Sequence, residues 1–124
     1  MGIRQEKINE QTQRELNEII RSVKDYRITS VLFNITAARV SKDLSVAKIY
    51  YSALPTGKNA VDIKEINKGL VSANGYIRSE LAKRLNLRIT PKLTFEFDNT
   101  VEKAMHIEKV LKEIDDESIN KQNS

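Results

Sequence analysis

Several residue types are scarce or missing in this chain of 124 residues, which has no cysteine, no tryptophan, one histidine and two prolines. Without cysteine it can form no disulfide, no thiolate zinc site and no cysteine nucleophile. The single histidine, His106, provides neither a metal-binding cluster nor a general base with its orienting partner. We therefore expect a protein that is not an enzyme, with no catalytic residues, no bound metal and no cofactor.

Long apolar stretches are also missing. No run approaches the roughly 20 residues that cross a bilayer, and the polar N-terminus has no signal-peptide core. We therefore expect a cytoplasmic protein with no membrane partner. Hydrophobic residues make up 40% of the chain and charged residues 31%, which is ordinary globular composition. The length suits a single domain.

Positive charge is concentrated in one part of the chain. Overall, 21 basic residues outnumber 17 acidic ones, for a net charge of +4. Residues 64–92 alone contain seven basic and two acidic side chains, a net charge of +5. A basic segment of this kind favours a polyanionic partner. An ordinary solvated surface is the alternative interpretation of the same charges.

Hydrophobic periodicity predicts a helix followed by a hairpin. Apolar residues at helical spacing indicate an amphipathic helix over about residues 4–24. Strict alternation then predicts one strand through Val31, Phe33, Ile35 and Ala37, and a second over residues 46–53. The turn residues at 41–44 join them, and Pro and Gly mark a loop at 54–59.

The second half of the chain continues this mixed order. Asp62 is the predicted N-cap of a helix, with Glu65 three residues later. The apolar pattern meets Asn74-Gly75 and resumes in a different phase at Ile77. This predicts two short helices joined by a break, with a positive φ at Gly75. A strand through Leu93 and Phe97 follows, and a last helix begins after Asn99 and extends to about residue 114.

These elements predict an α+β fold with the order α-β-β-α-kink-α-β-α. We expect a single domain over residues 1–114, with a three-stranded mixed sheet and helices packed on one face. The polar residues 115–124 are expected to form a disordered tail.

The aromatic residues argue against base recognition on an aromatic-rich sheet. Phe33, Phe95 and Phe97 all fall on the core-facing phase of their strands. Sheet-surface RNA readers need exposed rings for stacking, and Tyr50 is the one candidate in these strands. Ordinary strand packing is the favoured interpretation of Tyr50, with a stacking role as the alternative.

Three stretches of the chain contain short motifs in a defined order. Residues Val40–Tyr50 contain Asp-Leu-Ser at the predicted turn and Ala-Lys-x-Tyr after it. Residues Ala73–Arg78 contain Ala-x-Gly, and Leu87–Phe95 contain Leu-Arg-x-x-Pro-x-Leu-x-Phe. In this order the three resemble the hairpin, the kink and the last strand of the ribosome-binding factor A family. Each motif alone is weak, but their order and spacing make a specific combination over about residues 4–114. The family's Asp-Pro-Arg is Asp25-Tyr26-Arg27 here, so the first helix is expected to end less sharply.

The resemblance implies a KH-like (type II) fold and a role in ribosome assembly. It implies a monomeric factor that binds the free small (30S) subunit through 16S rRNA. Such a factor supports late maturation and 5′-end processing of that rRNA and growth in the cold. The alternative is a KH-like module that binds a ribosomal protein or an assembly GTPase instead of rRNA.

The resemblance and the charge pattern together give a set of candidate RNA-contacting residues. Small residues at the kink would let the backbone approach RNA closely, or would only let two helices pack at an angle, and both can hold. Basic residues would contact phosphates. The candidates are Ala73, Asn74, Gly75, Arg78, Lys83, Arg84, Arg88, Lys92, Arg39, Lys42 and Lys48.

Overall fold

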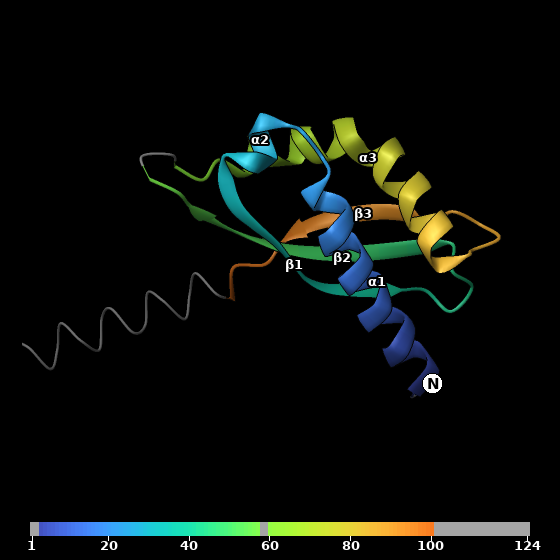
Figure 1. Ribbon diagram of the computed structural model, residues 1–124. Coiled ribbons are helices and arrows are strands. Elements are labelled where there is room, and N and C mark those ends of the chain that lie inside the picture. The colour runs from blue at the N-terminus through green and yellow to red at the C-terminus, as the bar shows by residue number, and fades with distance from the viewer. Residues whose placement is uncertain (1–2, 58–59, 101–124) are drawn as a thin grey trace, which may run out of the picture.

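The computed structural model describes residues 3–57 and 60–100 and confirms the α+β class (Figure 1). Its three strands form one mixed sheet in the order β1-β2-β3. Within the described ranges, no helix is both long enough and apolar enough to cross a membrane. The elements in chain order are α1 (Ile3–Arg21), α2 (Tyr26–Thr29), β1 (Val31–Val40), β2 (Val46–Pro55), α3 (Ile63–Leu85) and β3 (Lys92–Phe97).

Helix α1 ends at Arg21, three residues before its predicted end, and the unpredicted short helix α2 follows. Asp25 is the N-cap of α2, because its carboxylate accepts a hydrogen bond from the Arg27 backbone N–H at 2.9 Å. The same carboxylate accepts two hydrogen bonds from the Arg27 guanidinium, at 3.0 and 2.7 Å. These bonds hold the pKa of Asp25 below its ordinary value. Tyr26 is thus the first residue of a new helix and not the end of α1.

Polar side chains of α1 bind the outer edge of strand β1. An edge strand leaves backbone groups without a strand partner, and proteins usually cover or pair them. Here Asn9 accepts a hydrogen bond from the Val40 N–H at 2.9 Å, and further bonds reach the Ile35 and Val40 carbonyls. The side chains involved recur every four residues and so share one face of the helix: Gln5, Asn9, Gln13 and Asn17.

Strands β1 and β2 form the predicted antiparallel hairpin, with Arg39 opposite Lys48. A bulge between Ile35 and Ala37 shifts the register. The sequence placed Ala37 on the core side together with Ile35, but Ala38 is buried there instead and Ala37 is half-buried. The extra residue of the bulge restarts the alternation one position later, so the predicted phase of the second half of β1 is wrong.

Asp43 closes the turn between these two strands. Its carboxylate accepts hydrogen bonds from the Ser45 and Ser41 hydroxyls, each at 2.7 Å, and from the Ser45 N–H at 3.1 Å. These bonds lower the pKa of Asp43 to about 2. Leu44 takes a positive φ of 63° at the same turn. The predicted hairpin turn is therefore confirmed and is held by local polar contacts.

Helix α3 is continuous from Ile63 to Leu85, so the predicted break at Asn74-Gly75 is wrong. Gly75 does not take a positive φ, and the left-handed residue that ends the helix is Asn86, with φ 52°. Buried Leu70 and Ile77 are seven residues apart, which is close to two helical turns. The apolar phase is therefore maintained across the glycine, while the axis of α3 bends partway along its length (Figure 1).

The start of α3 is as predicted. The Asp62 carboxylate accepts hydrogen bonds from the backbone N–H groups of Lys64 at 3.1 Å and Glu65 at 3.3 Å. Asp62 is therefore the N-cap, and it satisfies donors that have no partner inside the helix.

Strand β3 pairs in parallel with β2, and α3 is the crossover between them. The Lys92 N–H donates to the Ser45 carbonyl at 2.9 Å, which joins the start of β3 to the hairpin turn. The three phenylalanines of the strands pack against the core, as predicted. Tyr51 is fully buried between two of them, with ring centroids 5.1 Å from Phe33 and 5.7 Å from Phe97.

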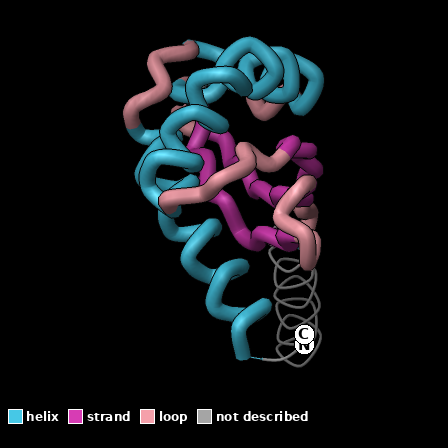
Figure 2. Tube along the Cα trace, turned by 90° about the vertical axis from the view of Figure 1, so that its right-hand side faces the viewer, coloured by secondary structure: helices cyan, strands magenta, loops and turns pink. Residues whose placement is uncertain are grey.

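The helices lie on one side of the sheet, as predicted, and the hydrophobic core fills the space between the two layers (Figure 2). Strand residues that point away from the helices are mostly exposed, including Leu32 at 60% and Val46 at 48%. The predicted last helix, with its apolar stripe from Ala104 to Ile114, and the tail at 115–124 lie outside the described residues.

Candidate nucleic-acid interface

The β1–β2 turn, the C-terminal part of α3 and the α3–β3 loop lie at the same end of the protein (Figure 1, right), and each of these segments contains basic residues. Two hydrogen bonds hold this region together. The Lys92 backbone N–H donates to the Ser45 carbonyl of the hairpin turn, and the Arg78 guanidinium donates to the Pro91 carbonyl at 2.9 Å. We call this region the basic end and define it by six exposed side chains: Arg39, Lys42, Lys48, Lys83, Arg88 and Lys92.

Three of these cations have neither an acidic nor an aromatic partner in the described part of the chain. The ion pairs of residues 3–57 and 60–100 include none of Arg39, Lys42, Arg88 and Lys92, and Arg39 contacts the Tyr50 ring, which leaves Lys42, Arg88 and Lys92 unpaired. All three are exposed. Unpaired, exposed cations are the groups that can neutralise phosphates at least cost, because no existing ion pair has to break.

The outer face of the sheet contributes Arg39, Lys48 and Tyr50. The Arg39 Cζ and the Lys48 Nζ lie 5.9 and 5.5 Å from the centre of the Tyr50 ring, within cation–π range. Lys48 also pairs with Glu96 at 2.8 Å, and this hydrogen bond raises the pKa of Lys48. The cation–π pairs were not foreseen, although the period of two in β2 already placed Lys48 and Tyr50 on the same face.

A shallow depression on α3 contains three of the predicted contact residues. Gly75, Arg78 and Lys83 line this open hollow of about 460 Å³. The remaining lining is supplied by Ser79, Ala82 and Thr90. Lys83 is 3.7 Å from Glu80 one turn earlier on the helix. The hollow therefore brings small residues and two cations together on one surface.

Two of the arginines predicted to contact RNA form hydrogen bonds or ion pairs within the protein. The Arg78 guanidinium donates to the carbonyls of Pro91 and Thr90, at 2.9 and 3.1 Å, and so holds the α3–β3 loop against the helix. Arg84 points toward α1, where it pairs with Glu15 at 3.1 Å and Glu18 at 2.8 Å. These pairs raise the pKa of Arg84. Sequence position alone could not separate these cations from the unpaired ones.

Ala73 and Asn74 lie inside α3 and not at an exposed turn, because the predicted break is absent. Both are half-buried. Asn74 lines a groove of about 260 Å³ between α3 and β3, together with Val71, Leu93 and Phe95. Among the described residues, the Asn74 Oδ1 has no hydrogen-bond donor. These two residues are therefore half-buried parts of a continuous helix and not members of the exposed basic end.

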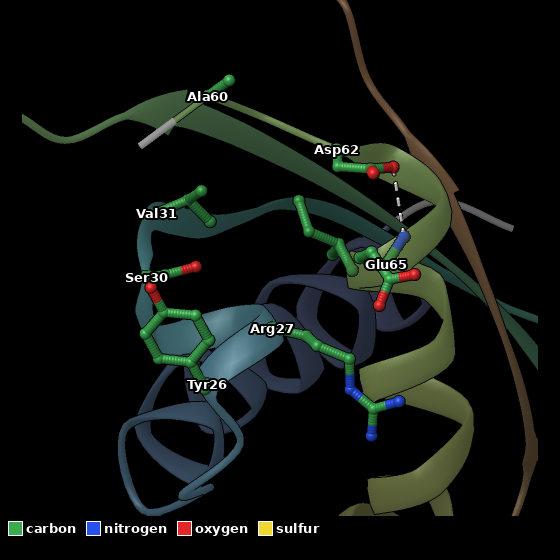
Figure 3. Close-up of a pocket in the computed structure, with 8 residues that line it drawn as sticks. Tyr26, Arg27, Ser30, Val31, Ala60, Asp62 and Glu65 are labelled. Carbon is green, nitrogen blue, oxygen red and sulfur yellow. Dashed lines mark hydrogen bonds between the residues drawn. The ribbon is translucent and has the colours of Figure 1, made fainter. Parts of the chain in front are cut away.

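A further pocket of about 230 Å³ lies at the N-terminal end of α3 (Figure 3). Tyr26, Asp62 and Glu65 line it, and Figure 3 shows the Asp62 carboxylate bonded to the Glu65 backbone. Nowhere in residues 3–57 and 60–100 do three or more His, Asp or Glu side chains gather in a way that could hold a metal. The lining has two carboxylates and one cation, Arg27, whose guanidinium is already bonded to Asp25. This pocket is therefore a poor site for a polyanion, unlike the basic end.

Comparison with known proteins identifies the family. A sequence model of the family described as ribosome-binding factor A matches residues 4–111. Ribosome-binding factor A of Clostridium perfringens (strain SM101) is 40% identical over 114 residues, covering 91% of this chain and 96% of that protein.

Solved structures of ribosome-binding factor A also match this chain. The crystal structure of ribosome-binding factor A from Thermus thermophilus superposes with a TM-score of 0.64 at 28% identity, covering 74% of this chain and 93% of that chain. A homology model of the Thermus thermophilus factor, fitted into a cryo-EM map of its complex with the 30S subunit, gives a TM-score of 0.56 at 30% identity. It covers 73% of this chain and 90% of that one. The fold of this chain is therefore the KH-like fold expected from the sequence.

Proposed function

Because the chain belongs to the ribosome-binding factor A family, we propose that it binds the free small ribosomal subunit through 16S rRNA. In this role it supports late maturation of the subunit and processing of the 5′ end of 16S rRNA. The fitted complex of the Thermus thermophilus factor with the 30S subunit supports this partner.

The observation that carries the proposal is the set of unpaired cations at the basic end. Lys42 comes from the β1–β2 turn, and Arg88 and Lys92 come from the α3–β3 loop and the start of β3. Hydrogen bonds between these elements fix the backbone positions of the three cations relative to one another, so only their side chains have to be ordered when they meet phosphates. Phosphate contacts of this kind supply most of the affinity of proteins for nucleic acids.

Within this proposal the α3 hollow is a second contact region. Gly75 has open space where a Cβ would be, since no atom lies within 4 Å of that position. RNA backbone can therefore approach α3 closely at Gly75, with Lys83 beside it. Arg78 and Arg84 contribute positive potential while they hold the loop and α1 in place. The half-buried Ala73 and Asn74 do not contact RNA directly in this proposal; they affect its approach only through the packing of α3.

We propose that the protein acts in the cytoplasm and catalyses no step itself. Binding would bias the structure of the precursor rRNA, and nucleases supplied by the cell would cut it. Incubation of the purified protein with precursor 16S rRNA and Mg²⁺ should leave the RNA intact. Cells that lack the protein should accumulate 16S rRNA with an extended 5′ end, and they should do so most strongly in the cold.

Co-sedimentation tests the partner directly. The purified protein is mixed with free small subunits, free large subunits or assembled ribosomes and centrifuged. We expect it to pellet with free small subunits and more weakly with assembled ribosomes. Pelleting with large subunits alone would contradict the proposal.

The alternative partner is a ribosomal protein or an assembly GTPase. Nuclease treatment separates the two cases, because an association that passes through rRNA is lost when the RNA is digested. An association that survives complete digestion would favour the protein partner.

A further inference from the structure

Tyr50 occupies the middle of the sheet face that points away from the helices. It lies on the central strand β2, between Ala37 of β1 and Glu96 of β3 in the register. The helices lie on the other side of the sheet (Figure 2). Tyr50 is half-buried, so part of its ring remains accessible on this face. It is therefore an aromatic residue on the outside of a sheet whose other strand aromatics, Phe33, Tyr51, Phe95 and Phe97, belong to the core side.

Two cations flank this ring. Arg39 and Lys48 are direct cross-strand partners, and both lie within 6 Å of the Tyr50 ring centre. Cation–π contacts limit the motion of the ring and keep the cations beside it. Lys92, at the start of β3, adds a third exposed cation to the same face.

Among the described residues, acidic groups on this face and at the adjoining turn are few and already bonded. At the turn, the Asp43 carboxylate accepts hydrogen bonds from the Ser41 and Ser45 hydroxyls. The Glu96 carboxylate is paired with Lys48 at 2.8 Å. Asp98 lies past the end of β3, away from the hairpin turn, and accepts hydrogen bonds from Thr36 and Thr100. The half of the face nearest the turn is therefore positively charged around one accessible aromatic ring, which is complementary to a nucleic acid and not to a basic protein surface.

We propose that Tyr50, Arg39 and Lys48 form a binding site for an unpaired base of single-stranded RNA and its flanking phosphates. The inference rests on the proposed function and specifies which form of RNA the outer sheet face takes. A base can stack on a side chain only when it is unstacked from its neighbours, as in loops and single strands. The cations would hold the phosphates on either side of that base, and the ring would add stacking that tolerates any base.

The site lies on the opposite side of the sheet from the α3 hollow. The sheet separates Tyr50 from Gly75 and Lys83, since α3 packs on the inner face (Figure 2). One protein would then contact RNA on two sides, with single-stranded RNA on the sheet face. This arrangement suits a factor that acts on immature rRNA, in which strands that later pair are still free.

Equilibrium binding to defined RNAs tests the site. The full chain is titrated into a labelled single-stranded oligouridine and into an RNA duplex of the same length, and binding is followed by fluorescence anisotropy. We expect Tyr50→Leu to lose roughly 5- to 100-fold in affinity for the single strand, as for the loss of one stacked base. Its affinity for the duplex should change by less than about 2-fold, since a duplex offers no free base face.

Matched variants separate stacking from other effects. Tyr50→Phe retains the ring and should keep the single-strand affinity within about 2-fold of the parent. Tyr26→Leu removes a tyrosine that is 73% exposed on α2, and it should bind like the parent. Arg39→Gln should reduce the slope of log K against log salt by about 0.7, the contribution of one phosphate of a single strand.

Two outcomes would overturn the site. One is a Tyr50→Leu variant that melts like the parent and binds the single strand equally well. The other is ultraviolet crosslinking of the bound oligouridine to the groove at Asn74 and Phe95 without any crosslink in the β2 peptide. If the parent pellets with small subunits while Tyr50→Leu pellets equally well, the site fails and the proposed function stands. If the parent itself does not pellet with small subunits, the proposed function fails first.

Discussion

Asn17 of α1 binds both backbone groups of Ile35 in β1: it accepts a hydrogen bond from the Ile35 N–H at 2.8 Å and donates one to the Ile35 carbonyl at 3.0 Å. The side-chain amide thus takes the place that a neighbouring strand would occupy. Ile35 is fully buried beside the bulge of β1. The contact closes one edge of the sheet at the position where its regular pairing is interrupted.

Replacement of Asn17 by alanine should destabilise the protein by about 1–3 kcal/mol, because the Ile35 N–H loses its acceptor while the backbone stays buried. The Ile35 carbonyl retains a bond from Gln13 at 3.2 Å. Denaturant unfolding measures the free energy, and hydrogen exchange should show faster exchange at the Ile35 amide. Gln11→Ala, at an exposed position on the same helix, is the control and should change stability by less than about 0.5 kcal/mol. Unchanged protection at Ile35 would show that the side-chain bonds are dispensable.

Two glycines of α3 should respond oppositely to the same substitution. A Cβ at Gly69 would lie 3.2 Å from the Ile28 Cγ1 and 3.3 Å from the Arg27 Cβ, whereas a Cβ at Gly75 would meet nothing within 4 Å. Gly69→Val should therefore cost about 1–3 kcal/mol by overpacking α2 against α3. Gly75→Val should be neutral or slightly stabilising, because valine favours a helix over glycine by a few tenths of a kcal/mol. Thermal melts of both variants provide the comparison.

The same pair of variants tests the continuity of α3. If Gly75 instead held a positive φ at a helix break, Gly75→Val would cost about 1–3 kcal/mol. A loss of that size at Gly75 would contradict the continuous helix. Such a loss would support the helix break at Asn74-Gly75 that was predicted from the sequence.

The Asp43 carboxyl should titrate near pH 2. Hydrogen bonds from the Ser45 and Ser41 hydroxyls lower its pKa from 3.8 to about 2. A lowered pKa means that the ionised form stabilises the folded state, so this contribution is present above about pH 4 and is lost as the pH falls toward 2. NMR titration of the Asp43 carboxyl carbon measures the pKa directly. Ser45→Ala should move that pKa back toward 3.8, and a value near 3.8 in the parent would show that the turn bonds do not form.

Much of the fold could be predicted because its signals are local. The Asp62 cap, the hairpin turn at Asp43 and the core phase of Phe95 each depend on residues a few positions apart. The break in α3 was predicted wrongly because Gly75 was interpreted as a helix end. The seven-residue spacing of Leu70 and Ile77, which fits one continuous helix, was given less weight. That spacing in fact continues one helical face.

The rest depends on contacts between distant segments, for which the sequence has no simple pattern. Polar residues every four positions in α1 indicate a solvated face, yet Asn17 and its neighbours bind the edge of β1. Likewise, nothing in the sequence distinguishes a paired arginine, such as Arg84, from an unpaired one, such as Arg88. Only the fold shows that Arg84 is paired with carboxylates of α1, while Arg88 is left unpaired within the described residues.

The salt dependence of small-subunit binding tests the central claim most directly. The claim is that the unpaired cations at the basic end, Lys42, Arg88 and Lys92, neutralise rRNA phosphates. A variant with all three replaced by glutamine is compared with the parent by co-sedimentation across a salt series, and Lys68→Gln serves as the control at an exposed, paired cation outside the basic end. We predict that the slope of log K against log salt becomes shallower by about 2–3 in the triple variant, since each phosphate contact contributes roughly 0.7–0.9. A triple variant that folds like the parent and binds small subunits with an unchanged slope would contradict the account.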